Sequence, residues 1–137
     1  MNNKTSANVR EMTQEDLLQA TGWLEARTGI PFPAGAMPRT GLAVQDGTGI
    51  VLVLAVYFER SSQMAVLGWC VGNPANRPHQ SRDAVRLALA AAEEYARRYG
   101  ASHLITMFGS RSLNRELERM GFAPGDTHVQ QKYKFLR

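Results

Sequence analysis

The stretch SRDAVRLALAAAEEYARRYG, residues 81–100, decides the fold class of this 137-residue chain. Its apolar positions recur every three or four residues, so it predicts one long amphipathic helix, Ser81–Tyr99, that ends at Gly100. A short apolar run, His103–Phe108, and a more polar helical pattern, Ser110–Met120, follow it. Helix, strand and helix in this order are typical of an α/β domain.

Upstream of the long helix, the sequence predicts one helix and a meander of strands. Thr13, with Asp16 three residues later, forms a capping-box signature for a first helix that ends at Gly29. Residues 30–40 contain three prolines and one glycine, which indicates a loop. The expected strands are Asn8–Met12, Gly41–Gln45, Ile50–Phe58 and Met64–Val71.

The two ends of the chain complete the expected domain. Alternating side chains in residues 129–135 predict a final strand. Pro78 is expected to precede the long helix, with Gln80 or Ser81 as its N-cap. We therefore expect a single α/β (α+β mixed sheet) domain over residues 8–137, in the order β-α-β-β-β-α-β-α-β, after a flexible N-terminus of residues 1–7.

Composition limits the classes of protein that need to be considered. A hydrophobic content of 44% with 20% charged residues is typical of a soluble globular domain, and no apolar run is long enough to cross a bilayer. The single cysteine, Cys70, excludes an internal disulfide and, with no signal peptide in view, favours a cytoplasmic location. The net charge of +4 fits either a solvated surface or a site for an anionic ligand, a phosphorylated cofactor or nucleic acid.

Two motifs support a family resemblance. ELERMGF, Glu116–Phe122, ends the last helix with a Gly-Phe pair, and CVGNP, Cys70–Pro74, ends the strand before the long helix. With the order of elements around them, they resemble the GNAT superfamily of acyl-CoA-dependent N-acetyltransferases. The resemblance covers the chain from Val9 onward and implies a GNAT-like fold with acetyl-CoA as co-substrate.

The resemblance also implies where the cofactor is held. Family members grip its pyrophosphate with a Q/R-x-x-G-x-G/A motif, because amides at a helix N-terminus face the anion and glycines allow close approach. The matching residues here are Gln80–Val85, with Asp83 and Val85 where the family has small residues. The backbone of the fourth strand is expected to pair with the pantetheine arm, since that strand bends away from the fifth. The implied cofactor-binding residues are Trp69, Cys70, Val71, Arg77, Gln80, Ser81, Arg82 and Ser110.

The catalytic positions depart from the family pattern. Residues 63–73 contain no carboxylate to act as a base. Leu117 stands where many family members carry a tyrosine that acts as a general acid. Glu59 and His79 are the remaining candidate bases, with water as the alternative. Cys70 is interpreted as a packed apolar side chain rather than an acyl carrier. The histidines have no metal-ligand spacing, so we expect no metal.

Two functions from different classes stay open. The first is an acetyl-CoA-dependent acyltransferase acting on a primary amine of unknown identity. The second is a GNAT scaffold without chemistry that binds protein or nucleic acid. In both, a homodimer through edge strands is an open possibility, and no membrane association is expected. The enzymatic interpretation depends on the third and fourth strands of the meander region parting to leave a slot in which the thioester's long arm lies.

Overall fold

The computed structural model describes residues 6–32, 35–106, 108, 110–125, 134 and 136, and its elements follow the predicted order. The elements along the chain are β1 (Asn8–Glu11), α1 (Gln14–Thr28), β2 (Gly41–Asp46), β3 (Gly49–Phe58), β4 (Met64–Gly72), α2 (Pro78–Arg98), β5 (His103–Thr106) and α3 (Arg111–Arg119). The sheet has the order β1-β2-β3-β4-β5, antiparallel except for the parallel pair β4–β5. Of the predicted last strand, residues 129–135, the structure describes Lys134 alone.

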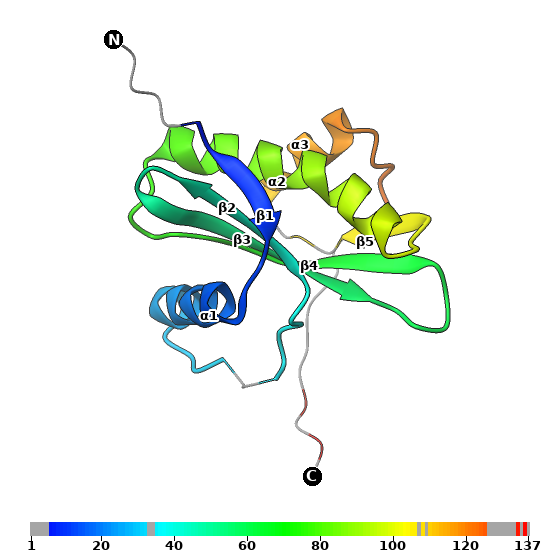
Figure 1. Ribbon diagram of the computed structural model, residues 1–137, viewed down its shortest axis with the longest axis horizontal. Coiled ribbons are helices and arrows are strands. Elements are labelled where there is room, and N and C mark those ends of the chain that lie inside the picture. Colours follow the sequence, from blue (N-terminus) through cyan, green and yellow to red (C-terminus); the bar gives the residue numbers. More distant parts are fainter. Residues whose placement is uncertain are drawn as a thin grey trace.

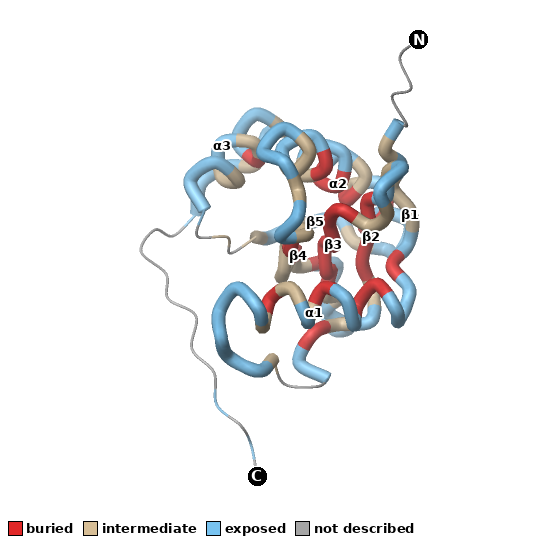
Figure 2. The backbone as a smooth tube through the Cα atoms, turned by 90° about the vertical axis from the view of Figure 1, so that its left-hand side faces the viewer, coloured by how far each residue is buried: buried red, intermediate tan, exposed pale blue. Residues whose placement is uncertain are grey.

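The chain forms three layers, with the sheet between two layers of helices (Figure 1). Helices α2 and α3 cover one face of the sheet and α1 covers the other, and the buried backbone lies in the sheet and on the helix sides turned toward it (Figure 2). Strand β3 runs through the centre, and residues 51–56 are all buried. A near-continuous apolar run suits a strand covered on both faces, as the sequence predicted.

The first helix begins and ends where local sequence signals placed it. The Thr13 side chain accepts a hydrogen bond from the Asp16 amide at 3.2 Å, and the Asp16 carboxylate accepts one from the Thr13 amide at 2.8 Å. Gly29 ends the helix in the left-handed conformation, with φ 72°. Both the capping box and the glycine stop are therefore confirmed.

The predicted start of the second long helix is wrong by three residues. Helix α2 begins at Pro78 with Arg77 as its N-cap, so neither Gln80 nor Ser81 caps it. Proline fits the first helical position because its missing N–H would have no intrahelical acceptor there. Gln80 occupies the third helical position, and its side-chain oxygen accepts a hydrogen bond from the Arg77 amide at 3.2 Å.

Two elements near the end of the chain differ in length from the prediction. Strand β5 stops at Thr106, so Phe108 lies outside it. Helix α3 has Ser110 as its N-cap, whose hydroxyl accepts a hydrogen bond from the Leu113 amide at 3.3 Å.

Within the described part of the chain, every helix is too short or too polar to cross a membrane.

Candidate functional site

A β-bulge at Gly68 shapes the centre of β4. The pairing with β3 passes from Val56↔Leu67 to Ala55↔Trp69, which leaves Gly68 as an extra residue. A Cβ at Gly68 would lie 2.3 Å from a ring carbon of Tyr57, so only glycine fits without a shift of that ring. A bulge bends its strand and interrupts the alternation of faces.

The change of face is visible in the packing on either side of the bulge. Ala65 and Leu67 belong to the core beneath α2, whereas Trp69 and Val71 pack in the core beneath α1. In a regular strand all four would share one face, because successive side chains alternate. The bulge therefore exposes a different set of backbone groups along the second half of β4.

The pairing of β4 with β5 ends at the bulge. Parallel partners run from Met64↔His103 to Leu67↔Thr106, and no described residue of β5 pairs with β4 beyond that point. We call the edge of β4 at residues 68–72, with which no described residue of β5 pairs, the β4 slot. The separation of the fourth and fifth strands follows the expectation from the resemblance. The expected parting of the third and fourth strands is wrong, because β3 and β4 stay paired from Leu52↔Gly72 to Phe58↔Ala65.

The register decides which backbone groups face the β4 slot. The Asn73 amide donates a hydrogen bond to the Val51 carbonyl at 2.9 Å, which places Asn73 in a pair bonded to β3. Because bonded and non-bonded pairs alternate in an antiparallel ladder, Trp69 and Val71 also turn their backbone groups toward β3. Cys70 and Gly72 turn theirs toward the slot. Of the three strand residues expected to contact the arm, the register favours Cys70 alone.

The turn between β4 and α2 is held by two asparagines that the sequence reasoning did not single out. The Asn76 side chain donates hydrogen bonds to the Val51 carbonyl at 2.7 Å and to the Ser81 hydroxyl at 3.2 Å. The Asn73 side chain accepts one from the Ala75 amide at 3.0 Å. Asn-Pro followed by Asn is a turn signal that could have identified them.

Gln80, the best match to the pyrophosphate motif, has both ends of its side chain engaged. Its oxygen accepts a hydrogen bond from the Arg77 amide, and its nitrogen donates to the Asp46 carboxylate at 2.8 Å and to the Thr48 hydroxyl at 3.3 Å. These contacts tie α2 to the β2–β3 turn. They also lower the pKa of Asp46, for which the hydrogen bond from Thr48 is the larger cause.

The other residues expected near a phosphate are distributed around the first turns of α2. Arg77, His79, Arg82 and Asp83 are exposed, and Ser81 is half-buried. The charge of Arg82 acts on Glu116 of α3, whose pKa is lowered chiefly by hydrogen bonds from Arg86. The structure therefore brings cations to this end of α2, with one carboxylate, Asp83, among them.

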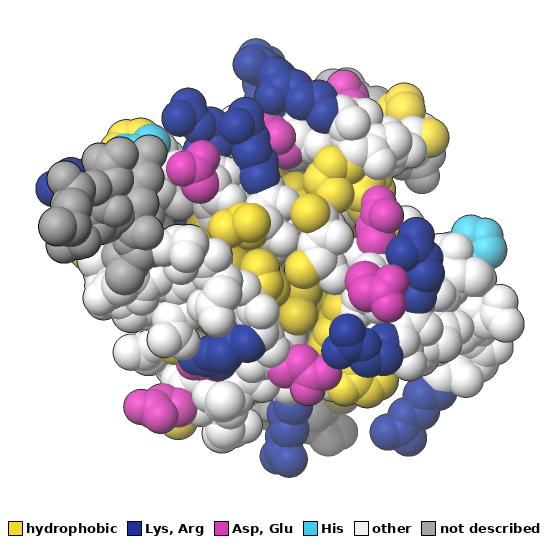
Figure 3. Space-filling model, turned by 45° about the horizontal axis from the view of Figure 1, so that its top comes forward, with side chains coloured by type: hydrophobic (Ala, Val, Ile, Leu, Met, Phe, Trp, Pro, Cys, Tyr) yellow, Lys and Arg dark blue, Asp and Glu magenta, His cyan; other side chains and the backbone are white. Residues whose placement is uncertain are grey.

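The charged surface over α2 and α3 is mixed rather than uniformly basic. Arg86 donates two hydrogen bonds to Glu116, at 3.0 and 3.1 Å, and Arg119 donates one at 2.9 Å. Figure 3 shows Lys and Arg side chains interspersed with Asp and Glu around an apolar area on this face. Interspersed signs favour ion pairs over a continuous nucleic-acid track.

The structure places Glu59 away from the β4 slot. It lies in the β3–β4 hairpin, where its carboxylate accepts hydrogen bonds from the Ser61 hydroxyl at 2.7 Å and the Ser61 amide at 2.9 Å. With added contributions from Ser62, these bonds lower the pKa of Glu59 to about 2. Its neighbour Phe58 lies four residues along β3 from Leu54, the partner of Cys70, which is about 13 Å at about 3.3 Å per residue. A carboxylate with so low a pKa is a weak base, so we do not assign it that role.

Two further side chains belong to the core and not to catalysis. Burial raises the pKa of the Cys70 thiol to about 12, so it stays protonated at neutral pH and is no nucleophile. Leu117 is buried beneath α2, which accounts for an apolar residue there. The amide of Asn114, one turn into α3, donates to the carbonyls of Phe108 and Ser110 at 2.8 and 2.9 Å, and so fixes the loop after β5.

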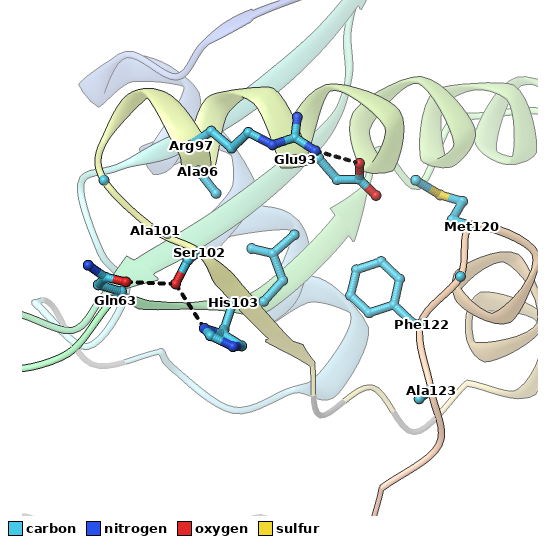
Figure 4. A pocket seen from close by; sticks show the side chains of 13 residues that line it. Gln63, Glu93, Ala96, Arg97, Ala101, Ser102, His103, Met120, Phe122 and Ala123 are labelled. Carbon is cyan, nitrogen blue, oxygen red and sulfur yellow. Dashed lines mark hydrogen bonds and ion pairs between the residues drawn. The ribbon is translucent and has the colours of Figure 1, made fainter.

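A separate hollow of about 890 Å³ lies at the start of β5, between the end of α2 and Gly121–Phe122. Figure 4 shows Ser102 on its wall between Gln63 and His103, with the hydroxyl donating to Gln63 at 3.0 Å. The residues after Ala123 include the predicted last strand, of which only Lys134 is described. We therefore assign no ligand to this hollow and keep the β4 slot as the candidate site.

Comparisons with known proteins agree with this geometry at the level of the fold. No protein-family model matches the sequence, and no curated protein matches it. A probable acetyltransferase of known structure superposes with a TM-score of 0.68 at 14% identity, over 95% of this chain and 99% of the other. A ribosomal-protein-alanine N-acetyltransferase from Brucella melitensis biovar Abortus 2308 gives 0.66 at 8%, over 93% and 99%.

A third similar structure carries a ligand. It is AAC(6')-Iy in complex with the bisubstrate analogue CoA-S-monomethyl-acetylneamine, with a TM-score of 0.62 at 12% identity, over 95% of this chain and 99% of the other. Identities this low concern the fold and not the reaction. With a mixed sheet that opens between its fourth and fifth strands, this chain has the fold of the GNAT acetyltransferases.

Proposed function

We propose that this protein transfers an acyl group, in the first instance acetyl from acetyl-CoA, to a primary amine. The observation that carries the proposal is the β4 slot, where the pairing with β5 ends and the backbone of Cys70 and Gly72 turns outward. An extended arm with amide groups fits beside such a strand, because it adds hydrogen bonds as an additional strand would.

The residues present fit the arm of acetyl-CoA better than its nucleotide. The outward N–H and C=O groups of Cys70 and Gly72 can pair with the pantetheine amides. Arg77 and Arg82 are exposed cations at the helix end where the phosphates would lie. The CoA-containing bisubstrate analogue in AAC(6')-Iy supports this class of donor by likeness of fold alone.

The transfer itself needs only modest help from side chains. The amine nitrogen attacks the thioester carbonyl carbon, the new C–N bond forms and the C–S bond breaks. The thiolate leaves and takes up, directly or through water, the proton that the amine loses. Backbone N–H groups facing the slot polarise the carbonyl as negative charge develops on its oxygen. Holding the amine against the thioester supplies the remaining advantage, through proximity.

A titration and a transfer assay test the proposal. We expect acetyl-CoA to give heat and a thermal shift, and a panel of primary amines to release free thiol from acetyl-CoA. Cys70→Ala is the matched control, since it keeps the backbone and removes the thiol, and it should retain kcat/KM within about threefold. No heat and no thermal shift at millimolar acetyl-CoA would discard the proposal, and a large loss in Cys70→Ala would point to an acyl-thiol intermediate instead.

A second candidate is a scaffold that binds protein or nucleic acid without chemistry. It is favoured by the exposed carboxylate of Asp83 at the expected phosphate end of α2 and by a core leucine, Leu117, at the family's tyrosine position. Gel-shift and pull-down panels would show a partner if this function holds. Amine-dependent consumption of acetyl-CoA with no partner in either panel would remove it.

A further inference from the structure

We infer that this chain recognises its acyl donor through the pantetheine arm alone, so that thioesters of pantetheine without the nucleotide serve as donors about as well as acetyl-CoA. The inference rests on the proposed function and names the part of the donor that the site binds. It is carried by a contrast between two halves of the site. No described residue of β5 pairs with β4 along residues 68–72, whereas at the start of α2 the family's glycines are replaced, Gln80 and Ser81 are hydrogen-bonded to other residues, and the exposed side chains of Arg77 and Arg82 are the cations left for a pyrophosphate.

The backbone donors at the start of α2 are few. Pro78 has no N–H, and the Arg77 amide donates to the Gln80 side chain at 3.2 Å. The Ser81 amide already donates to the Arg77 carbonyl at 3.1 Å, as the first bond of the helix. Of the amides that a helix N-terminus normally offers to an anion, only those of His79 and Gln80 remain without an intrahelical acceptor.

The residues that match the family's glycines are already part of the helix. Residues 83–85 lie within α2, which begins at Pro78, so their amides belong to the helical ladder and form no loop around a phosphate. Asp83 is exposed on this part of α2. Asp83 lies five residues into α2, about 8 Å along the axis from Pro78 at 1.5 Å per residue, and its negative charge would weaken the attraction of this end of the helix for an anion.

The polar side chains at this end are also engaged elsewhere. Gln80 is held by Asp46 and Thr48, and the Ser81 hydroxyl accepts a hydrogen bond from Asn76. The contacts of Gln80 link α2 to the β2–β3 turn, so releasing the side chain for a phosphate would break contacts between elements.

The arm, by contrast, meets a stretch of β4 with which no described residue of β5 pairs. The backbone of Cys70 and Gly72 faces away from β3, and the described part of β5 pairs only with residues 64–67 of β4. Backbone hydrogen bonds to the arm do not depend on the groups at the end of α2. Binding through the arm can therefore persist where the nucleotide is held only weakly.

A donor series on the full chain tests the inference. Acetyl-CoA, S-acetyl-4'-phosphopantetheine and S-acetyl-pantetheine are compared with one amine acceptor at saturation. We expect kcat/KM values within about threefold of one another. If the nucleotide contributes no binding energy, its removal cannot lower kcat/KM. A preference for acetyl-CoA above about thirtyfold would overturn the inference while leaving the proposed function in place. No transfer from any of the three donors would overturn both.

One substitution sharpens the test. Asp83→Asn removes the charge at nearly constant shape and should raise kcat/KM for acetyl-CoA while leaving S-acetyl-pantetheine unchanged. Glu94→Gln, an exposed carboxylate nearer the other end of α2, is the matched control and should change neither. Equal effects of Asp83→Asn on both donors would contradict a pyrophosphate-specific repulsion and overturn the inference.

Discussion

Gly68 acts on the candidate site through its missing side chain. Its position opposite the Tyr57 ring, with 2.3 Å between a hypothetical Cβ and a ring carbon, lets the extra residue of the bulge fit beneath the ring. The same residue marks the point where β4 leaves β5. One glycine therefore couples the packing of the sheet to the opening of the β4 slot.

Substitution of Gly68 should reveal that coupling. We expect Gly68→Ala to lower the free energy of unfolding by about 1–3 kcal/mol, because the added methyl group overpacks the site against Tyr57. Gly22→Ala is the control, since Gly22 lies in α1 with no atom near its hypothetical Cβ and should gain about 0.5–1 kcal/mol. Urea denaturation measures both. Unchanged stability of Gly68→Ala would show that the ring moves freely and is not held against the bulge.

Among the described residues, Asp16 is the charged residue that is buried, with 2% of its surface exposed. Burial alone would raise its pKa, but hydrogen bonds from Arg10 and Thr13 outweigh burial and lower it. The folded pKa therefore lies below the unfolded value of about 3.9. The contribution of Asp16 to stability is present above the unfolded pKa and is lost as the pH falls through the folded pKa.

Replacement of Asp16 should remove both stability and pH dependence. We expect Asp16→Asn to lose about 1–3 kcal/mol at pH 7, because Arg10 is left without its partner. The difference between the variant and the wild type in free energy of unfolding should become smaller as the pH falls below about 4. Glu15→Gln, an exposed neighbour, should stay within about 0.5 kcal/mol. A gap that stays constant from pH 7 to pH 3 would mean that the ion pair adds nothing.

Among the elements, α1 was predictable from the sequence and the start of α2 was not. The capping box and Gly29 are local signals, and both lie within one turn of the helix end that they define. The start of α2 depends on the turn before it, where Asn76 reaches the Val51 carbonyl of β3. That contact joins residues 25 positions apart, so no local pattern could indicate that the helix begins as early as Pro78.

The burial of α2 gives a prediction with a matched pair on one helix. Leu89 is 1% exposed and faces the sheet, whereas Leu87, two residues earlier, is 38% exposed. Leu89→Ala should cost about 2–5 kcal/mol through lost burial and a residual cavity. Leu87→Ala should cost much less, because more than a third of the Leu87 side chain already lies in water and its removal leaves no closed cavity. Comparable losses, measured by thermal and urea unfolding, would contradict the assignment of the inner face.

For the whole molecule, periodicity predicted the layers but not the chemistry of the site. Strand and helix periods identify buried faces, so the order of elements and the mixed sheet followed from the sequence. The bulge at Gly68 was missed, although a glycine within an apolar strand signals one. Glu59 was a reasonable candidate base by position, yet the turn serines hold its pKa at about 2. Such shifts come from hydrogen bonds whose geometry the sequence does not contain.

The absence of an assigned base among the described residues of the slot leads to a prediction about pH. If the amine enters as its free base without help from a side chain, log kcat/KM should rise with a slope of about 1 per pH unit up to the pKa of the amine, and then level off. Two acceptors whose amine pKa values differ should give profiles displaced by that difference. Glu59→Gln and His79→Ala should both follow the wild-type profile within about threefold. An inflection at one pH for both acceptors, lost in either variant, would instead identify that side chain as the base.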